Sequence, residues 1–208
     1  MARHQIVITC LTGNNAHDGS ITRGSLNLHM RALSAGKYSK NLEIHSQLES
    51  PYLKPTDAAM MCASVSSMKV KMPTLWPTLR IYLRGHGGFE RQTLGGLGPA
   101  GWAEALSGLG IFGVGLYSVT GCRLGRDTGS TVEQPLLDVP NSFASNFHRL
   151  LADKRDVYAR TELVGVYQDG SKATSITKQP LAYRRKAPGS KVRFTWEDGE
   201  QKRSLVYV

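Results

Sequence analysis

Cysteines and long apolar runs are scarce in this sequence, and each scarcity excludes a class of protein. Three cysteines in 208 residues are too few for a disulfide framework and too scattered for a zinc site, whose ligands would need paired spacing. We therefore expect a reducing compartment and no metal. No apolar stretch approaches the roughly 18 residues that a membrane span needs. Residues 1–15 lack the apolar region and cleavage site of a signal peptide, so any export would use another route.

What is present fits one globular domain with an uneven charge. Hydrophobic residues make up 40% of the chain, which argues against disorder and provides for a real core. Lysine and arginine number 26 against 16 acidic residues, and nine of these cations lie in 172–208 beside only three acidic residues. This C-terminal excess indicates either a solvated basic face or a site for a polyanion, such as nucleic acid, anionic lipid or a phosphorylated small molecule.

Hydrophobic periodicity predicts an alternation of strands and helices up to about residue 160. Alternating or apolar runs predict strands at 4–11, 42–48, 79–84, 114–119 and 156–167. The Pro-punctuated segment 51–77 is expected to be a loop with a short helix or strand. After the turn signal Asp169-Gly170, only short strands and turns are expected.

Three helices complete this pattern. They are predicted from Ser20 to about Gly36, from Pro99 through Leu106, and after a cap at Asn141 or Ser142. We therefore expect a single domain, 1–208, of the α/β class. A sandwich with a central, mostly parallel sheet flanked by helices would span 1–160, and a basic β-flap, defined as residues 161–208, would follow it.

Two predicted strands each end on a glycine that is followed by a reactive side chain. These side chains are His86 and Cys122, and their separation of 36 positions matches the length of one crossover connection. If the strands are parallel neighbours, both side chains emerge at the carboxyl edge of the sheet, where α/β folds place their sites. There, His86 could act as acid or base for a Cys122 thiolate. The alternative is a turn histidine beside an inert buried thiol.

Together these motifs resemble the caspase-like (clan CD) cysteine peptidases. The closer resemblance is to the inositol hexakisphosphate-activated cysteine protease domain of MARTX and large clostridial toxins. It is carried by LRIYLRGHG and YSVTGCRL and continues through NSFASNFHRLLADKRDVYARTEL, DGSK and KVRFTW. By this resemblance Cys122 is the nucleophile, His86 is the general acid/base, and the amides of Gly87 and Cys122 form the oxyanion hole. It further implies cleavage after leucine, in a protein substrate or in the chain itself.

The resemblance also implies an allosteric activator, inositol hexakisphosphate, bound by basic residues. The positions that match the family's phosphate-binding residues are Lys37, Arg80, Arg160, Lys172, Lys186 and Lys191. It implies a protein that a bacterium secretes without a cleavable signal peptide and that acts in the host cytosol, either as an excised toxin domain or as a free-standing effector. Asp18 and Asn15 are candidates for orienting His86.

Other readings of the same residues stay open. A thiol acyltransferase could use the same Cys/His pair. Alternatively, a caspase-like module with an inactive pair could bind nucleic acid or anionic lipid through its basic flap, although nucleic acid is the less favoured partner. Aromatic residues interleave with the basic ones there, as in proteins that bind single strands: Tyr183, Phe194, Trp196 and Tyr207.

Overall fold

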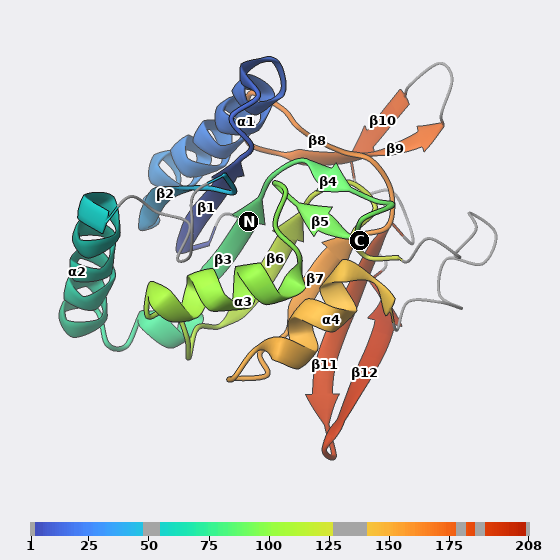
Figure 1. Ribbon diagram of the computed structural model, residues 1–208. Helices are drawn as coiled ribbons and strands as arrows, with labels where there is room; N and C mark the ends of the chain where they lie inside the picture. Colours follow the sequence, from blue (N-terminus) through green and yellow to red (C-terminus); the bar gives the residue numbers. More distant parts are fainter. Residues whose placement is uncertain (1–2, 48–54, 127–140, 178–181, 186–189, 207–208) are drawn as a thin grey trace.

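The computed structural model describes residues 3–47, 55–126, 141–177, 182–185 and 190–206. Its centre is a seven-stranded sheet in the order β12-β11-β7-β6-β3-β1-β2 (Figure 1). Within this order, neighbouring strands from β2 to β7 pair in parallel, whereas β11 pairs antiparallel with both β7 and β12. Their bounds are β1 Gln5–Leu11, β2 Ser39–His45, β3 Arg80–Arg84, β6 Leu116–Thr120, β7 Val157–Arg160, β11 Lys191–Glu197 and β12 Glu200–Leu205. The expected α/β fold with a mostly parallel central sheet is thus confirmed.

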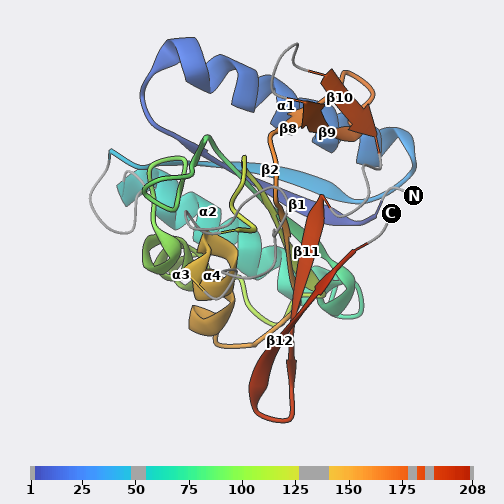
Figure 2. The same cartoon turned by 90° about the vertical axis from the view of Figure 1, so that its right-hand side faces the viewer.

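Four helices flank this sheet, on both of its faces. They are α1 Asn15–Ser34, α2 Pro55–Lys71, α3 Pro99–Gly108 and α4 Phe143–Leu150, and Trp76–Thr78 form a 3-10 turn. Figure 2 shows α1 on one face, together with a small sheet of β8 Val164–Val166, β9 Lys172–Thr177 and β10 Ala182–Arg185. Helices α2, α3 and α4 cover the other face. A two-stranded ribbon, β4 Gly87–Gly88 with β5 Thr93–Leu94, follows β3. No helix in the described part of the chain is both long and apolar enough to cross a membrane.

One face of the sheet packs on a large apolar core, and the opposite face packs on a much smaller apolar cluster and is more polar. Along β1, Ile6, Ile8 and Cys10 join the main core, whereas Val7 packs with Leu28 of α1 on the opposite side. This alternation follows from the period of two in a strand. The polar face, which α1 and the small sheet cover, carries charged and hydroxyl side chains of the strands, such as Arg84, Ser118 and Thr120.

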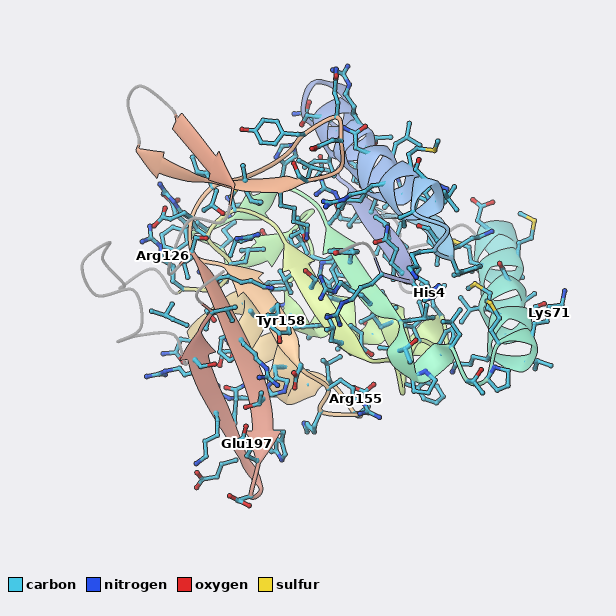
Figure 3. All side chains as sticks on the ribbon, turned by 180° about the vertical axis from the view of Figure 1, so that it is seen from behind. His4, Lys71, Arg126, Arg155, Tyr158 and Glu197 are labelled. Atoms are coloured by element: carbon cyan, nitrogen blue, oxygen red, sulfur yellow. The ribbon has the colours of Figure 1, made fainter. Side chains whose placement is uncertain are left out.

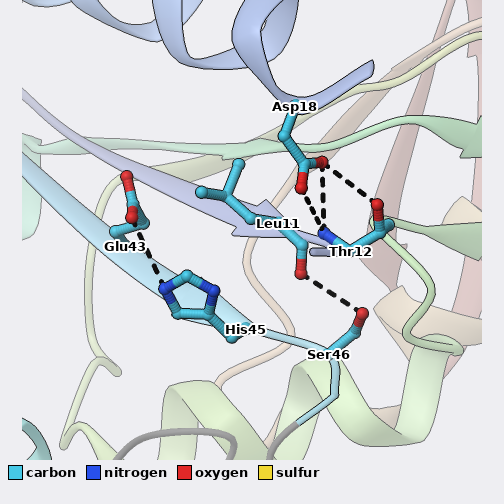
Figure 4. Close-up of polar contacts among 6 residues, drawn as sticks. All are labelled: Leu11, Thr12, Asp18, Glu43, His45 and Ser46. Atoms are coloured by element: carbon cyan, nitrogen blue, oxygen red, sulfur yellow. Dashed lines mark hydrogen bonds and ion pairs between the residues drawn. The ribbon is translucent and has the colours of Figure 1, made fainter. Parts of the chain in front are cut away.

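Strand β2 spans Ser39–His45 where 42–48 was predicted, and three further predicted elements differ from the structure. Helix α1 begins at Asn15, not at Ser20, because the Asp18 carboxylate accepts hydrogen bonds from Thr12 N and Thr12 Oγ1 and so ties the first turn to the end of β1 (Figure 4). The segment expected to be mostly loop contains the long helix α2. Its core-facing residues recur at helical spacing: Ala58, Met61, Cys62, Val65 and Met68.

The third difference concerns the strand predicted at 156–167. It is two strands, β7 and β8, and the chain leaves the central sheet between them. The β-flap divides in the same way, since β8, β9 and β10 form the small sheet while β11 and β12 extend the central one. Other predictions hold: α3 begins at Pro99, and the Ser142 hydroxyl caps α4 by accepting from Ser145 N at 3.2 Å.

Candidate active site

The strands that precede His86 and Cys122 are parallel neighbours. Strands β3 and β6 pair along their whole length, with Arg84 opposite Thr120. After each of these two strands, the chain turns out of the sheet at the next glycine. His86 and Cys122 then line one pocket of about 270 Å³, together with Ile21 of α1 and the whole of β8. The expected pairing of the two strands is therefore confirmed, and it brings the histidine and the thiol to a common hollow.

Gly87 packs directly on the backbone of Cys122. A Cβ atom added to Gly87 would lie 2.4 Å from Cys122 O and 2.5 Å from Cys122 N, closer than real Cβ contacts. Only glycine therefore lets the histidine-bearing turn approach the cysteine this closely. The approach places the Gly87 backbone beside the Cys122 amide.

Ion pairs between side chains hold the segment after Cys122 in place. Arg123 adopts a positive φ of 58° and donates its backbone N–H to Glu162 O at 3.2 Å. The Glu162 carboxylate pairs with Arg126 at 2.9 Å and with Arg123 at 3.5 Å. Because Arg126 is buried, this pairing anchors the loop against the connection between β7 and β8.

A second hollow, the basic cavity, lies on the same polar face of the sheet. It measures about 410 Å³, and four of the six predicted phosphate-binding residues line it: Arg80, Arg160, Lys172 and Lys191. Figure 3 views this side, where the nitrogen-bearing side chains gather on the strands beside Tyr158. Lys37 is not among the lining residues, and Lys186 lies outside the described residues. The structure adds Arg3 and Arg31, which the sequence analysis did not single out.

The charges in this cavity repel one another. Burial first, and then Arg80, Arg160 and Arg3, lower the pKa of Lys191 to about 8. Burial and the neighbouring cations Arg160, Arg84, Arg80 and Lys191 likewise hold the pKa of Lys172 well below its usual range. Asp169 is the only acidic residue among those that line the cavity. An anion placed here would relieve this repulsion.

Lys172 connects the basic cavity to the strand that leads to Cys122. Its Nζ donates to Thr120 Oγ1 at 2.7 Å and to Ser118 Oγ at 3.4 Å, and it lies 4.0 Å from the centre of the Tyr82 ring. Thr120 also lines the Cys122 pocket. The hairpin of β8 and β9 therefore borders both hollows, since β8 lines one and Lys172 at the start of β9 lines the other.

Asp18 and Asn15 were the two candidates for orienting His86, and the structure describes the side chain of Asp18 alone. The Asp18 carboxylate is engaged with Thr12, and this contact joins β1 to α1 (Figure 4). The side chain of Asn15 lies outside the described residues. All three cysteines are free thiols, and Cys10 is buried in β1 with its pKa raised to about 12, chiefly by burial. Among the described residues, no group of three or more His, Cys, Asp or Glu side chains gathers to hold a metal.

Sequence reasoning missed Arg84, which is almost fully buried at the end of β3 and lines the Cys122 pocket. The signal was available, because a charged residue interrupts the apolar run immediately before Gly85-His86. Comparison of the chain with protein-family models finds no match, and a search of curated proteins finds none either.

Proposed function

We propose that this protein is a cysteine endopeptidase whose activity is controlled by an inositol polyphosphate. The observation that carries the proposal is the juxtaposition of two hollows on one face of the sheet. One is lined by His86 and Cys122, and the other by six basic side chains with a single carboxylate, that of Asp169, among its lining residues. Cys122 is the proposed nucleophile, and His86 is its acid and base. Inositol hexakisphosphate is the proposed activator.

A peptide substrate fits the surroundings of the cysteine. Strand β8 stands at the edge of the small sheet and lines the Cys122 pocket, so an extended peptide could pair along it. Ile21, Val164 and Val166 give the pocket apolar walls, which supports cleavage after leucine. The thiolate would attack the peptide carbonyl to form a thioester, His86 would give a proton to the leaving amine, and water would then release the acid. The Gly87 and Cys122 amides would stabilise the oxyanion.

Control by a polyanion follows from the position of Lys172. A ligand in the basic cavity would draw the Lys172 ammonium into a charge-assisted contact, while the same lysine also contacts Thr120 on the strand that leads to Cys122. The ligand would therefore favour one arrangement of the β8–β9 hairpin, and β8 borders the substrate pocket. We infer that a bacterium secretes the protein and that it acts in the cytosol of a host cell, on host proteins or on its own chain.

The decisive experiment adds inositol hexakisphosphate to the purified protein and follows both melting and cleavage. At a hundredfold excess over Kd, the ligand should stabilise the protein by about 2.7 kcal/mol, which is a shift of several degrees. It should also start cleavage of leucine-containing peptides or of the chain itself. Cys122→Ala should keep the melting shift and lose all cleavage.

A matched pair of charge variants tests the cavity. Lys172→Met should lose most of the shift and the activation, whereas Lys71→Met removes the same charge from the exposed end of α2 and should change neither (Figure 3). Stabilisation by single-stranded oligonucleotide in place of the hexakisphosphate would favour a nucleic-acid-binding module. Activity without any ligand would refute the proposed role of the activator and would leave the Cys122–His86 pair as a constitutive peptidase.

A further inference from the structure

A buried cation adjoins the proposed nucleophile. Arg84 is 4% exposed, and it lines the same pocket as Cys122 and His86. It is the last residue of β3 and pairs in register with Thr120, two residues before Cys122. Gly24 of α1 makes room for it, since an added Cβ there would lie 2.5 Å from Arg84 Nη2.

The hydrogen-bond partners of Arg84 are neutral. Its Nε donates to Ser25 Oγ at 3.0 Å, and Nη2 lies 3.5 Å from Ile21 O. Ser25 Oγ also accepts from Thr9 Oγ1 at 2.7 Å. Among the described residues, no carboxylate forms an ion pair with Arg84. A charge buried among neutral dipoles is costly unless an opposite charge lies near it.

The other charged groups around the pocket do not supply that opposite charge. His86 and Lys172 are neutral or positive, and Glu162 is engaged with Arg123 and Arg126. The lining residues from α1 and β8 are uncharged: Ser20, Ile21, Gly24, Val164, Gly165 and Val166. Among the described residues that line the pocket, Cys122 is the one whose side chain can become an anion.

We propose that Arg84 is a positioning residue that stabilises the thiolate of Cys122 as its buried counter-ion. The inference rests on the proposed role of Cys122 as nucleophile. The thiol gives its proton to His86, and the sulfur anion that remains shares its pocket with the guanidinium. Burial lowers the pKa of Arg84 to about 10, and interaction with the Cys122 thiolate opposes this shift, so the guanidinium stays charged at neutral pH. Thiolates next to arginine react at neutral pH because the anionic form is populated there.

The test measures the rate at which iodoacetamide alkylates Cys122 between pH 5 and pH 10, with each cysteine resolved by mass spectrometry. The full chain is used with and without inositol hexakisphosphate. In Arg84→Met the inflection should move up by at least about one pH unit, so the rate at pH 7 should fall about tenfold or more. Arg84→Lys keeps the charge and should restore most of that rate. Cys62, on α2, serves as an internal control and should not change.

A second measurement avoids altering Arg84, in case its replacement unfolds the chain. The ultraviolet absorbance of the thiolate, taken as the difference between each protein and its Cys122→Ser counterpart, is titrated in wild type and in His86→Ala. Thiolate that persists at neutral pH in His86→Ala supports Arg84 as the counter-ion. Its loss there, or an unshifted inflection in a folded Arg84→Met, would overturn the inference. Neither readout needs peptide cleavage, so a protein that cuts no peptide yet shows these shifts would refute the proposed function alone.

Discussion

Because Gly87 contacts the backbone of Cys122, adding one methyl group at Gly87 tests the geometry of the site. In Gly87→Ala the new Cβ would lie 2.4 and 2.5 Å from backbone atoms of Cys122, whereas ordinary contacts begin near 3.4 Å. One of the two backbones must therefore move by about 1 Å, because neither contact atom belongs to a flexible side chain. Overpacking of this kind costs about 1–3 kcal/mol, which lowers the melting temperature of a chain this size by about 2–12 °C.

The same displacement should reach the chemistry. A misplacement of about 1 Å in reacting groups can cost about a hundredfold in rate, so cleavage should fall by about that factor in Gly87→Ala. Gly88→Ala is the matched control, because its added Cβ would meet only the hydroxyl of Thr93, which can rotate away. The assay is peptide cleavage together with thermal melting of both variants. Wild-type activity and melting in Gly87→Ala would refute the packing argument and the placement of the oxyanion hole.

Two further predictions concern charge. The depressed pKa of Lys191, about 8 against an ordinary 10.5, means that between these pH values the folded protein has lost a proton that the unfolded chain keeps. The free energy of unfolding should therefore gain a contribution that rises with pH across this window, and the affinity for inositol hexakisphosphate should fall there. Lys191→Met should weaken both trends in melting and calorimetric titrations, leaving the part that Lys172 contributes, and trends of unchanged size would contradict the assignment. Glu162→Gln should destabilise the protein by about 3 kcal/mol, because it leaves the buried charge of Arg126 without its partner, and should loosen the segment after Cys122. Chemical denaturation measures the first effect, proteolytic susceptibility measures the second, and no change in either would show that Arg126 finds another partner.

The elements that the sequence predicts well are those written in short-range patterns. Alternating or apolar runs mark β1, β3 and β6, Pro99 begins α3, and the Ser142 cap begins α4. Helix α2 was missed although its core-facing residues recur at helical spacing, because flanking prolines and many small or polar residues obscure the period. A pattern within one helical turn or two strand repeats is enough to predict an element when the tertiary contacts favour the same structure.

By itself, the sequence determined that a histidine and a cysteine would each follow the end of a strand, because a glycine after an apolar run is a local signal. Only the tertiary structure decided that β3 and β6 are neighbours and that β7 and β8 belong to different sheets. It also decided which cations meet, since Arg3, Arg80 and Lys191 come together through strand pairing across almost the whole chain. The burial of Arg84 beside Cys122 has the same origin, because a strand's composition does not specify which helix will cover it or which group will lie opposite its charge.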